Sequence, residues 1–268
     1  MRKEIVLDLE TKKAPESFGG RDLTTLGISV VGTWLSGANE FRAFREHEFK
    51  ELGELLKNAD LVIGFFITKF DLPVLQPYLD FNVNELPVLD IFDDVVEKLG
   101  HRVSLASLSK ATLNASKSGH GLDAITWYHE GNWERLIEYC IQDVRLTRDL
   151  YTYGQKNGHL LFESFVDNKT VSVPVSWGMP DEGEIRGLIT KAHEDRRVVE
   201  IDYVSRENAG DGFKKTRKIE VQNVNGDEIT AYDHLRDDVR GFRIGRILAA
   251  QILNEPTKER MVAQSLFG

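Results

Sequence analysis

Two carboxylates interrupt an apolar run near the start of the chain, Ile5-Val6-Leu7-Asp8-Leu9-Glu10-Thr11. Such a run is typical of a buried β-strand, in which an ionised group needs a partner or a ligand. Side chains two residues apart point to the same face of a strand, so Asp8 and Glu10 are expected side by side. Adjacent carboxylates repel each other unless a cation neutralises them. The segment predicts either a cation site or a strand that frays into solvent at Asp8.

Length and composition indicate a soluble, cytoplasmic protein with one large or two modest domains in 268 residues. The first residues are too few and too acidic for a signal peptide, and no apolar run is long enough to span a bilayer. The single cysteine, Cys140, excludes an internal disulfide framework and a multi-cysteine zinc site. The net charge of -9 argues against a protein that coats nucleic acid electrostatically.

The first part of the chain has the pattern of a mixed sheet with helices packed on it. Apolar runs predict further strands at residues 27–35, 40–44, 61–66 and 86–91. Helical spacing predicts helices at 47–57, 70–79, from 91 to 99, 105–113, 122–130 and 133–153. Strands come first and helices dominate later, so we expect an α/β fold.

A change of composition separates this part from a smaller one. Residues 154–183 are rich in Gly and Pro and have little periodicity, which indicates a domain boundary. A helix at 183–192 and strands at 198–204, 216–224, 228–232 and 241–248 are expected beyond it. The predicted organisation is a first domain at 1–165, a linker at 166–183, a β-rich domain at 184–254 and a tail at 255–268.

Two further segments carry acidic residues in suggestive places. Phe70 and Asp71 follow a predicted buried strand, and Tyr139 and Asp143 lie four apart on one face of a predicted helix. Each has an ordinary explanation: Asp71 before Pro73 suits a helix N-cap, Tyr139 suits a core position, and Asp143 suits a surface charge pair. Taken singly, the cap and the core position are the favoured explanations for Asp71 and Tyr139, and each motif is weak by itself.

Together with Asp8 and Glu10, these segments resemble the three motifs of the DEDD-type 3′-5′ exonucleases, which have a ribonuclease H-like fold. Asp8-Leu9-Glu10-Thr11 matches the first motif, Phe70-Asp71 the second, and Tyr139 with Asp143 the third. Glu138 occupies the position where a sister branch has His, so the chain is similar to the tyrosine branch. The resemblance covers about residues 4–155. The chain departs from it at Gly64-Phe65-Phe66, where relatives often carry Gly-Phe-Asn.

The resemblance implies two-metal hydrolysis of DNA or RNA from single-stranded 3′ ends, with release of nucleoside 5′-monophosphates. Asp8, Glu10, Asp71 and Asp143 would be the ligands of two Mg²⁺ or Mn²⁺ ions, which prefer oxygen donors. Tyr139 would position the attacking water, since a phenol with an ordinary pKa near 10 is a poor base. The substrate would lie against residues of the first two motifs, Leu9, Thr11 and Phe70.

The β-rich part resembles the WYL domain, a small SH3-like β-barrel often found as a ligand-sensing module. Tyr232 and the Arg-rich ending are retained, whereas the Trp-Tyr-Leu triplet is not. Tyr232, Arg236, Arg240 and Arg243 would bind a nucleotide or single-stranded nucleic acid through a guanidinium cluster that also includes Arg246. The alternative is that neighbouring aspartates neutralise these arginines on a solvated surface.

Two other functions remain open on the sequence. A regulatory or scaffold protein could keep the nuclease fold without activity and sense a ligand through its second domain, and an endonuclease could use the same acidic set. Outside the motifs, Asp90, Asp93 and Asp94 are interpreted as residues that cap and solvate a helix. Cys140 is interpreted as small core filling, and His120 as an exposed loop residue.

Overall fold

The structure, a computed structural model, describes residues 2–14, 22–116, 121–163, 169–177, 182–204 and 214–258. The chain divides into two compact units, the first comprising Met1–Met179 and Val204–Lys214, the second Pro180–Tyr203 and Lys215–Gly268. Within the described residues, none of the helices has the length and apolar character needed to cross a membrane.

The first unit is built on a five-stranded mixed sheet with the order β3-β2-β1-β4-β5. The central strand β1 (Glu4–Thr11) pairs antiparallel with β2 (Ile28–Leu35) and parallel with β4 (Leu61–Gly64). The outer strands are β3 (Glu40–Phe44), antiparallel to β2, and β5 (Val88–Asp90), parallel to β4. The predicted mixed sheet flanked by helices is therefore confirmed.

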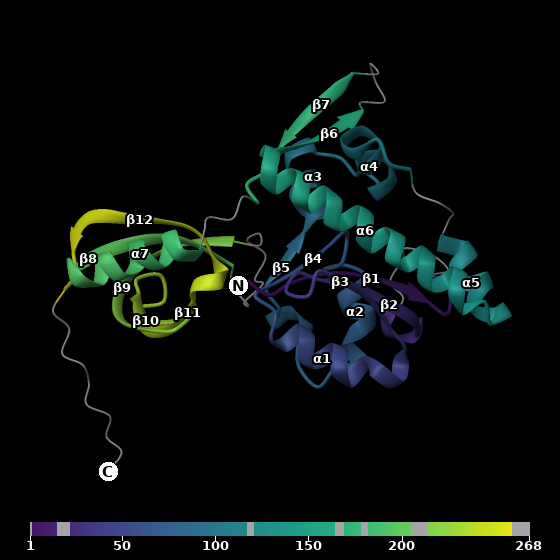
Figure 1. Cartoon of the computed structure of the whole chain (residues 1–268), viewed down its shortest axis with the longest axis horizontal. Coiled ribbons are helices and arrows are strands. Elements are labelled where there is room, and N and C mark those ends of the chain that lie inside the picture. Colours follow the sequence, from purple (N-terminus) through teal and green to yellow (C-terminus); the bar gives the residue numbers. More distant parts are fainter. Residues whose placement is uncertain are drawn as a thin grey trace, which may run out of the picture. The chain divides into compact units, whose positions relative to one another are not determined.

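Helices lie against both faces of this sheet (Figure 1). The α-helices are α1 (Phe49–Lys57), α2 (Asp71–Leu75), α3 (Ile91–Leu99), α4 (Leu105–Leu113), α5 (Gly121–Glu130) and α6 (Trp133–Asn157). Short 3-10 helices are η1 (Leu23–Thr25), η2 (Glu46–Glu48), η3 (Gln76–Tyr78) and η4 (Val83–Glu85). The long α6 begins at the N-cap Asn132, whose side chain accepts from the Arg135 N–H, and ends at Gly158 in the left-handed conformation typical of a C-cap.

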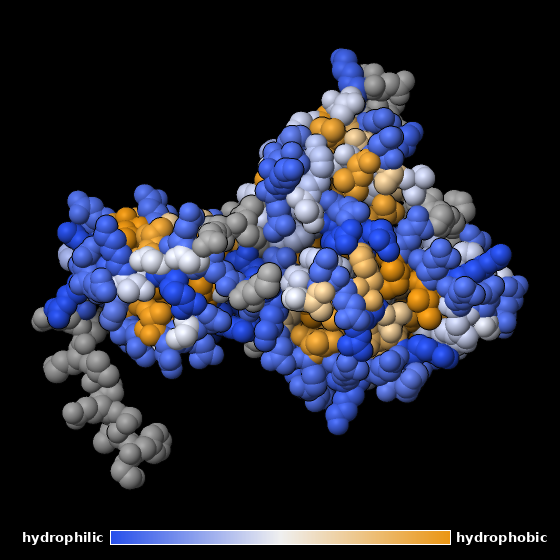
Figure 2. Space-filling model, viewed as in Figure 1, coloured by the Kyte–Doolittle hydropathy of each residue, from blue (hydrophilic) through white to orange (hydrophobic). Residues whose placement is uncertain are grey.

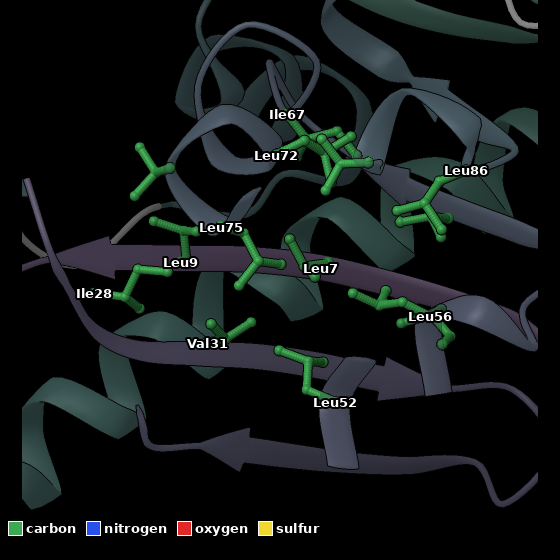
Figure 3. Packing of buried hydrophobic residues seen from close by; sticks show 14 of the residues in the cluster. Leu7, Leu9, Ile28, Val31, Leu52, Leu56, Ile67, Leu72, Leu75 and Leu86 are labelled. Carbon is green, nitrogen blue, oxygen red and sulfur yellow. The ribbon is translucent and has the colours of Figure 1, made fainter. Parts of the chain in front are cut away.

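Alternation along β1 divides its side chains between two environments. Ile5, Leu7 and Leu9 are buried in a core that includes Leu52 and Leu56 of α1 and residues of α2 (Figure 3). Each such side chain contributes about 1.5–3 kcal/mol by leaving water. The even-numbered residues Val6, Asp8 and Glu10 point to the other face of the sheet. That face is covered by α6, whose Leu136 and Cys140 pack against Val30 of β2.

The segment 154–183, expected to be irregular, contains a β-hairpin that the sequence reading missed. Strands β6 (His159–Glu163) and β7 (Thr170–Pro174) pair antiparallel, so β7 lies inside the expected linker. The buried residues Leu160 and Phe162 alternate with less buried ones, a strand signal that the Gly and Pro content obscured. Trp177, fully buried, donates from its Nε1–H to Asp94 at 2.8 Å and ties this segment to α3.

The second unit is a five-stranded sheet of order β11-β10-β9-β8-β12 with one helix, α7 (Glu182–Glu194). Its strands are β8 (Arg197–Val204), β9 (Lys214–Asn225), β10 (Glu228–Asp233), β11 (Asp238–Arg243) and β12 (Ile247–Pro256). The pairs β9–β10, β10–β11 and β8–β12 are antiparallel. The order does not close into a barrel among the described residues.

Two sequence expectations for this unit are corrected. The strand expected at 241–248 is interrupted by the 3-10 turn η5 (Ile244–Arg246), which separates β11 from β12. Strand β12 also extends to Pro256, into the expected tail, because it pairs with β8 as far as Arg197. Apolar residues of α7, the strands and η5 form the core of this unit. In Figure 2 polar residues cover most of the visible face of each unit, and apolar patches show among them.

Candidate active site

The first motif lies on β1 with its carboxylates on the face covered by α6. Asp8 is opposite Gly32 and Glu10 is opposite Val30 in the antiparallel register of β1 and β2. Both acidic side chains are half-buried. The strand therefore does not fray into solvent at Asp8, since it remains paired through Thr11.

Helix α6 brings the third motif to the same place. Carboxylate oxygens of Asp8, Glu10 and Asp143 all lie within 4.8 Å of one another. Asp143 is 3% exposed, which rules out the expected alternative of a surface charge. Tyr139, also 3% exposed, lies one turn earlier on α6. Its ring is 5.7 Å from that of Trp127 on α5.

A glycine permits this close approach of helix and sheet. A Cβ atom on Gly32 would lie 2.9 Å from Cys140 Sγ and 2.9 Å from Val144 Cγ2, both on α6. Side chains essentially never approach so closely, so any larger residue would force α6 away from β2. Cys140, fully buried in the cluster with Val30, is core filling as expected.

The second motif joins the site through a hydrogen bond to the first. Leu9 N–H donates to Asp71 Oδ1 at 3.0 Å, and Asp71 is 4% exposed. Asp71 is the first residue of α2, and the N-cap position falls on Phe70 without a side-chain hydrogen bond. The N-cap interpretation of Asp71 is therefore wrong: its carboxylate holds the end of β1 instead.

Negative charge is concentrated around these residues. Burial raises the pKa of Asp71 to about 7; the Leu9 N–H opposes this rise, and the carboxylates of Asp90 and Asp143 add to it. Burial raises the pKa of the Cys140 thiol well above its usual value, with further contributions from Asp8, Glu10 and Asp143. Several carboxylates gathered in one place are the kind of oxygen donor set that Mg²⁺ or Mn²⁺ prefers. The site therefore fits a divalent metal.

The three residues expected to contact substrate, Leu9, Thr11 and Phe70, differ in whether their side chains face the core or the site. The Leu9 side chain is buried in the core on the opposite face from Asp8, so only its backbone belongs to the site. Thr11 is 6% exposed and its hydroxyl donates to the Lys13 carbonyl at 2.8 Å. Phe70 is half-buried against the same core as Leu9. The expectation of a Leu9 side-chain contact is corrected, because strand alternation directs that side chain inward.

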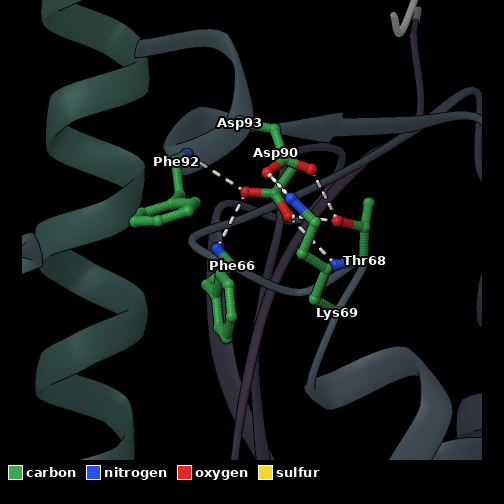
Figure 4. A network of polar contacts seen from close by, with 6 residues as sticks. All are labelled: Phe66, Thr68, Lys69, Asp90, Phe92 and Asp93. Carbon is green, nitrogen blue, oxygen red and sulfur yellow. Dashed lines mark hydrogen bonds and ion pairs between the residues drawn. The ribbon is translucent and has the colours of Figure 1, made fainter. Parts of the chain in front are cut away.

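Sequence reasoning missed the role of Asp90. It caps α3 as expected, accepting from Phe92 N–H at 3.0 Å, but it is buried rather than solvated. Its carboxylate also accepts from the N–H groups of Phe66 (2.8 Å) and Thr68 (2.9 Å) and from the Thr68 hydroxyl (2.8 Å) (Figure 4). Asp90 thus holds the loop that leads to Asp71. Its position at the end of an apolar run, after Leu89, was the available signal.

That loop contains the departure from the family motif. Phe66 has φ +69°, in the left-handed region that Asn or Gly adopt readily and other residues rarely. Its ring packs edge-to-face on Phe92 at 4.8 Å, and the Arg102 guanidinium lies 5.2 Å from the Phe66 ring centre. The Asp90 carboxylate and these ring contacts together hold Phe66 in a conformation that is unfavourable by itself. His120 lies outside the described residues.

In the second unit the predicted arginines do not form one cluster. Arg240 and Arg243 are three apart on β11 and so point to opposite faces of the strand. Arg236 and Arg240 are exposed, whereas Arg246 is only 4% exposed. Tyr232 is largely buried on β10, and its hydroxyl donates to Asp237.

A buried ion pair lies near Tyr232 in the chain. Arg217 of β9 pairs with Asp233, the last residue of β10, and both side chains are at least 95% buried. A buried pair of this kind fixes how two strands meet rather than binding a ligand at the surface.

The mixed sheet, its helices and the acidic cluster define an α/β protein with a metal-type site at the end of a central strand. The family described as the RNase H superfamily matches residues 6–155, more than half of the chain. The chain therefore belongs to the RNase H superfamily, through its first unit. This confirms the ribonuclease H-like fold expected from the motifs.

Comparison with individual proteins adds two distant similarities. No curated protein matches the sequence. The family B DNA polymerase from the hyperthermophilic archaeon Pyrobaculum calidifontis is 12% identical over 57% of this chain and 24% of its own, with a TM-score of 0.46. Proteasome accessory factor B/C (PafBC) of Arthrobacter aurescens is 17% identical over 62% of this chain and 22% of its own, with a TM-score of 0.28. The chain thus spans about a quarter of each.

Proposed function

We propose that this protein is a metal-dependent 3′-5′ exonuclease that hydrolyses single-stranded 3′ ends of DNA or RNA and releases nucleoside 5′-monophosphates. The observation that carries the proposal is the meeting of Asp8, Glu10 and Asp143, whose oxygens lie within 4.8 Å. Asp71 completes the acidic set through its hydrogen bond from Leu9 N–H. Membership of the RNase H superfamily supports hydrolysis of nucleic acid.

In this proposal Asp8, Glu10, Asp71 and Asp143 hold two divalent cations, Mg²⁺ or Mn²⁺. When bound, such ions supply Lewis acidity toward the scissile phosphate and its departing oxygen. Metal binding is favoured by the fixed positions of the ligand residues. Asp143 is fixed on a long helix that packs on the sheet, and Asp8 and Glu10 are fixed by strand pairing.

The remaining residues orient the reactants. The Tyr139 hydroxyl positions a water molecule for attack on phosphorus, and Thr11 and Phe70 border the 3′ end. Attack forms one P–O bond and breaks the bond between phosphorus and the 3′ oxygen of the preceding nucleotide. The water supplies the proton that this oxygen takes up. Tyr139 is buried beside Asp143, a position that suits orientation rather than exchange of protons with solvent.

The test uses a 5′-labelled single-stranded oligonucleotide with Mg²⁺ or Mn²⁺. A ladder that shortens from the 3′ end is expected, and Asp8→Asn, Asp143→Asn and Tyr139→Phe should each slow it at least tenfold. Asp149→Asn serves as the control, because Asp149 lies on the same helix, is 39% exposed and pairs with Arg148. Activity of Asp8→Asn equal to that of the unaltered protein would remove the proposal. Cleavage of circular strands would reassign it to an endonuclease.

For the second unit we propose a WYL-like module with an SH3-like barrel at about residues 184–254 that binds a nucleotide or single-stranded nucleic acid. The exonuclease domain would occupy residues 1–165. The small antiparallel sheet and the exposed Arg236 and Arg240 support this. Titration calorimetry of the full chain with oligonucleotides and nucleotides tests it. Arg236→Ala and Arg240→Ala should weaken binding, and Arg186→Ala, which removes the contacts of Arg186 with Gly226 and Asp227, should not.

A further inference from the structure

A row of alternating cations and aromatic rings begins where β1 ends. Lys12 Nζ lies 5.8 Å from the centre of the Tyr128 ring. The Tyr128 and Trp133 rings are 5.7 Å apart and nearly perpendicular, at 88°. The Arg45 guanidinium lies over the Trp133 ring at 3.8 Å. We refer to Lys12, Tyr128, Trp133 and Arg45 as the stacking row.

The stacking row starts beside the acidic site. Lys12 is two residues beyond Glu10 along the chain. Tyr128 follows Trp127, whose ring contacts Tyr139 at 5.7 Å. The row therefore leads from the carboxylates along the end of α5 to the first residue of α6.

The four side chains of the row remain accessible. Lys12, Tyr128 and Trp133 are half-buried, and Arg45 is exposed. By contrast Tyr151 of α6 and Trp177, whose ring lies 6.2 Å from that of Tyr151, are at most 1% exposed. Tyr128 and Trp133 pack on a small cluster that includes Ala124 and Leu136 and stay partly open to solvent. The stacking row thus offers accessible aromatic rings and cations beside an acidic centre. A ligand that carries both flat apolar groups and negative charge would complement it.

We propose that the stacking row binds the single strand that continues beyond the scissile nucleotide, with bases on Tyr128 and Trp133 and phosphates at Lys12 and Arg45. The inference rests on the proposed function and names the part of the substrate that lies outside the metal centre. Base–aromatic stacking with neighbouring cations is the mode by which proteins hold single strands without reading sequence. It also explains how a chain of net charge -9 can retain a nucleic acid.

Glu46 neutralises part of the positive charge of this row. Lys12 Nζ pairs with Glu46 Oε2 at 2.7 Å, and the Glu46 side chain is 57% exposed. Exposed pairs of this kind contribute little, so a phosphate can displace the carboxylate. Removal of the Glu46 charge should therefore tighten the complex.

The experiment measures binding without hydrolysis. Fluorescein-labelled dT12 and rU12 are titrated with the full chain in EDTA, and fluorescence anisotropy reports the dissociation constant. Trp133→Ala and Tyr128→Ala should each weaken binding about 5- to 150-fold. Lys12→Ala and Arg45→Gln should each reduce the slope of log K against log salt by about 0.7. Glu46→Gln should strengthen binding of both oligonucleotides.

Trp34→Ala is the matched control. Trp34 is also a half-buried tryptophan near an arginine, 5.8 Å from Arg148, but it is paired with Val6, toward the opposite end of β1 from Glu10. The inference would be overturned if Arg45→Gln and Trp133→Ala left the dissociation constant unchanged. It would also be overturned if Trp34→Ala weakened binding as much as Trp133→Ala does. Because Arg45 is exposed, its variant tests the row even if Trp133→Ala unfolds. Failure of the nuclease assay with intact row-dependent binding would instead remove only the catalytic proposal.

Discussion

Replacing Asp143 by Asn should stabilise the metal-free protein while abolishing its stabilisation by divalent cations. The carboxylate oxygens of Asp8, Glu10 and Asp143 lie within 4.8 Å of one another, so the three groups repel one another when ionised. With an effective dielectric constant of about 20, one such pair costs about 3 kcal/mol, and water near the half-buried Asp8 and Glu10 reduces this. Asparagine has the same shape without the charge, and its amide can donate to the neighbouring carboxylates. We expect a gain of about 1–3 kcal/mol in the free energy of unfolding.

The effect of cations has the opposite sign. An ion that binds only the folded state at one hundred times its dissociation constant stabilises it by about 2.7 kcal/mol. For a unit of this size, each kcal/mol shifts the melting temperature by about 2–4 °C, so Mn²⁺ should raise it by about 5–11 °C. Asp143→Asn should lose most of this shift because one of the charged ligands is gone.

Thermal unfolding followed by circular dichroism, in EDTA and in a Mn²⁺ series, measures both quantities. Asp149→Asn controls for the loss of a charge elsewhere on α6, since Asp149 pairs with Arg148 at 2.5 Å outside the acidic group. The reasoning is refuted if Asp143→Asn retains the full Mn²⁺ shift. It is also refuted if the metal-free variant is less stable than the unaltered protein by more than about 1 kcal/mol.

Three further substitutions test how the site is supported. Gly32→Ala should cost about 1–3 kcal/mol in urea unfolding and reduce hydrolysis disproportionately, because its Cβ would lie 2.9 Å from Cys140 Sγ on the helix that carries Asp143. Asp90→Asn should cost a similar amount, since three backbone N–H donors lose a charged acceptor. Asp93→Asn, at a half-exposed position, should change stability by less than about 0.5 kcal/mol. Phe66→Gly should be about 1 kcal/mol more stable than Phe66→Ala, because φ is +69°, and equal stabilities would show that the backbone there relaxes.

The two faces of β1 could be predicted because side-chain alternation depends only on the residues of the strand itself. Alternation of apolar and acidic residues gave both the buried face and the pairing of Asp8 with Glu10, and the structure has Leu7 and Leu9 in the core on the other side. The prediction that Asp143 lies close to Asp8 and Glu10 came from the order of the three motifs, because no local pattern in the helix indicates it. A helix seen alone does not say which strand its face will cover.

Features set by contacts between distant segments were not predictable. The Asp71 carboxylate was open to interpretation as an N-cap until its partner, the Leu9 N–H, was known. Asp90 was expected to be solvated because neighbouring Asp93 and Asp94 suggested a charged helix end, yet it is 5% exposed and satisfied by a loop 22 and 24 residues earlier. The β6–β7 hairpin was missed because Gly and Pro around it outweighed two short runs of alternating residues.

The strand that carries Asp8 and Glu10 is also the central strand of its sheet, and the two facts are connected. Repulsion among carboxylates favours an arrangement in which β1 moves away from α6. Ile5, Leu7 and Leu9 oppose this, since each would lose about 1.5–3 kcal/mol on leaving the core, and pairing with β2 and β4 on both edges adds to the resistance. Burial of the apolar side chains on one face of β1 therefore holds the carboxylates close together on the other face. Weakening the odd-numbered face, for example with Leu9→Ala, should therefore lower affinity for Mn²⁺ although no ligand is changed, and an unaltered affinity in a folded variant would contradict this coupling.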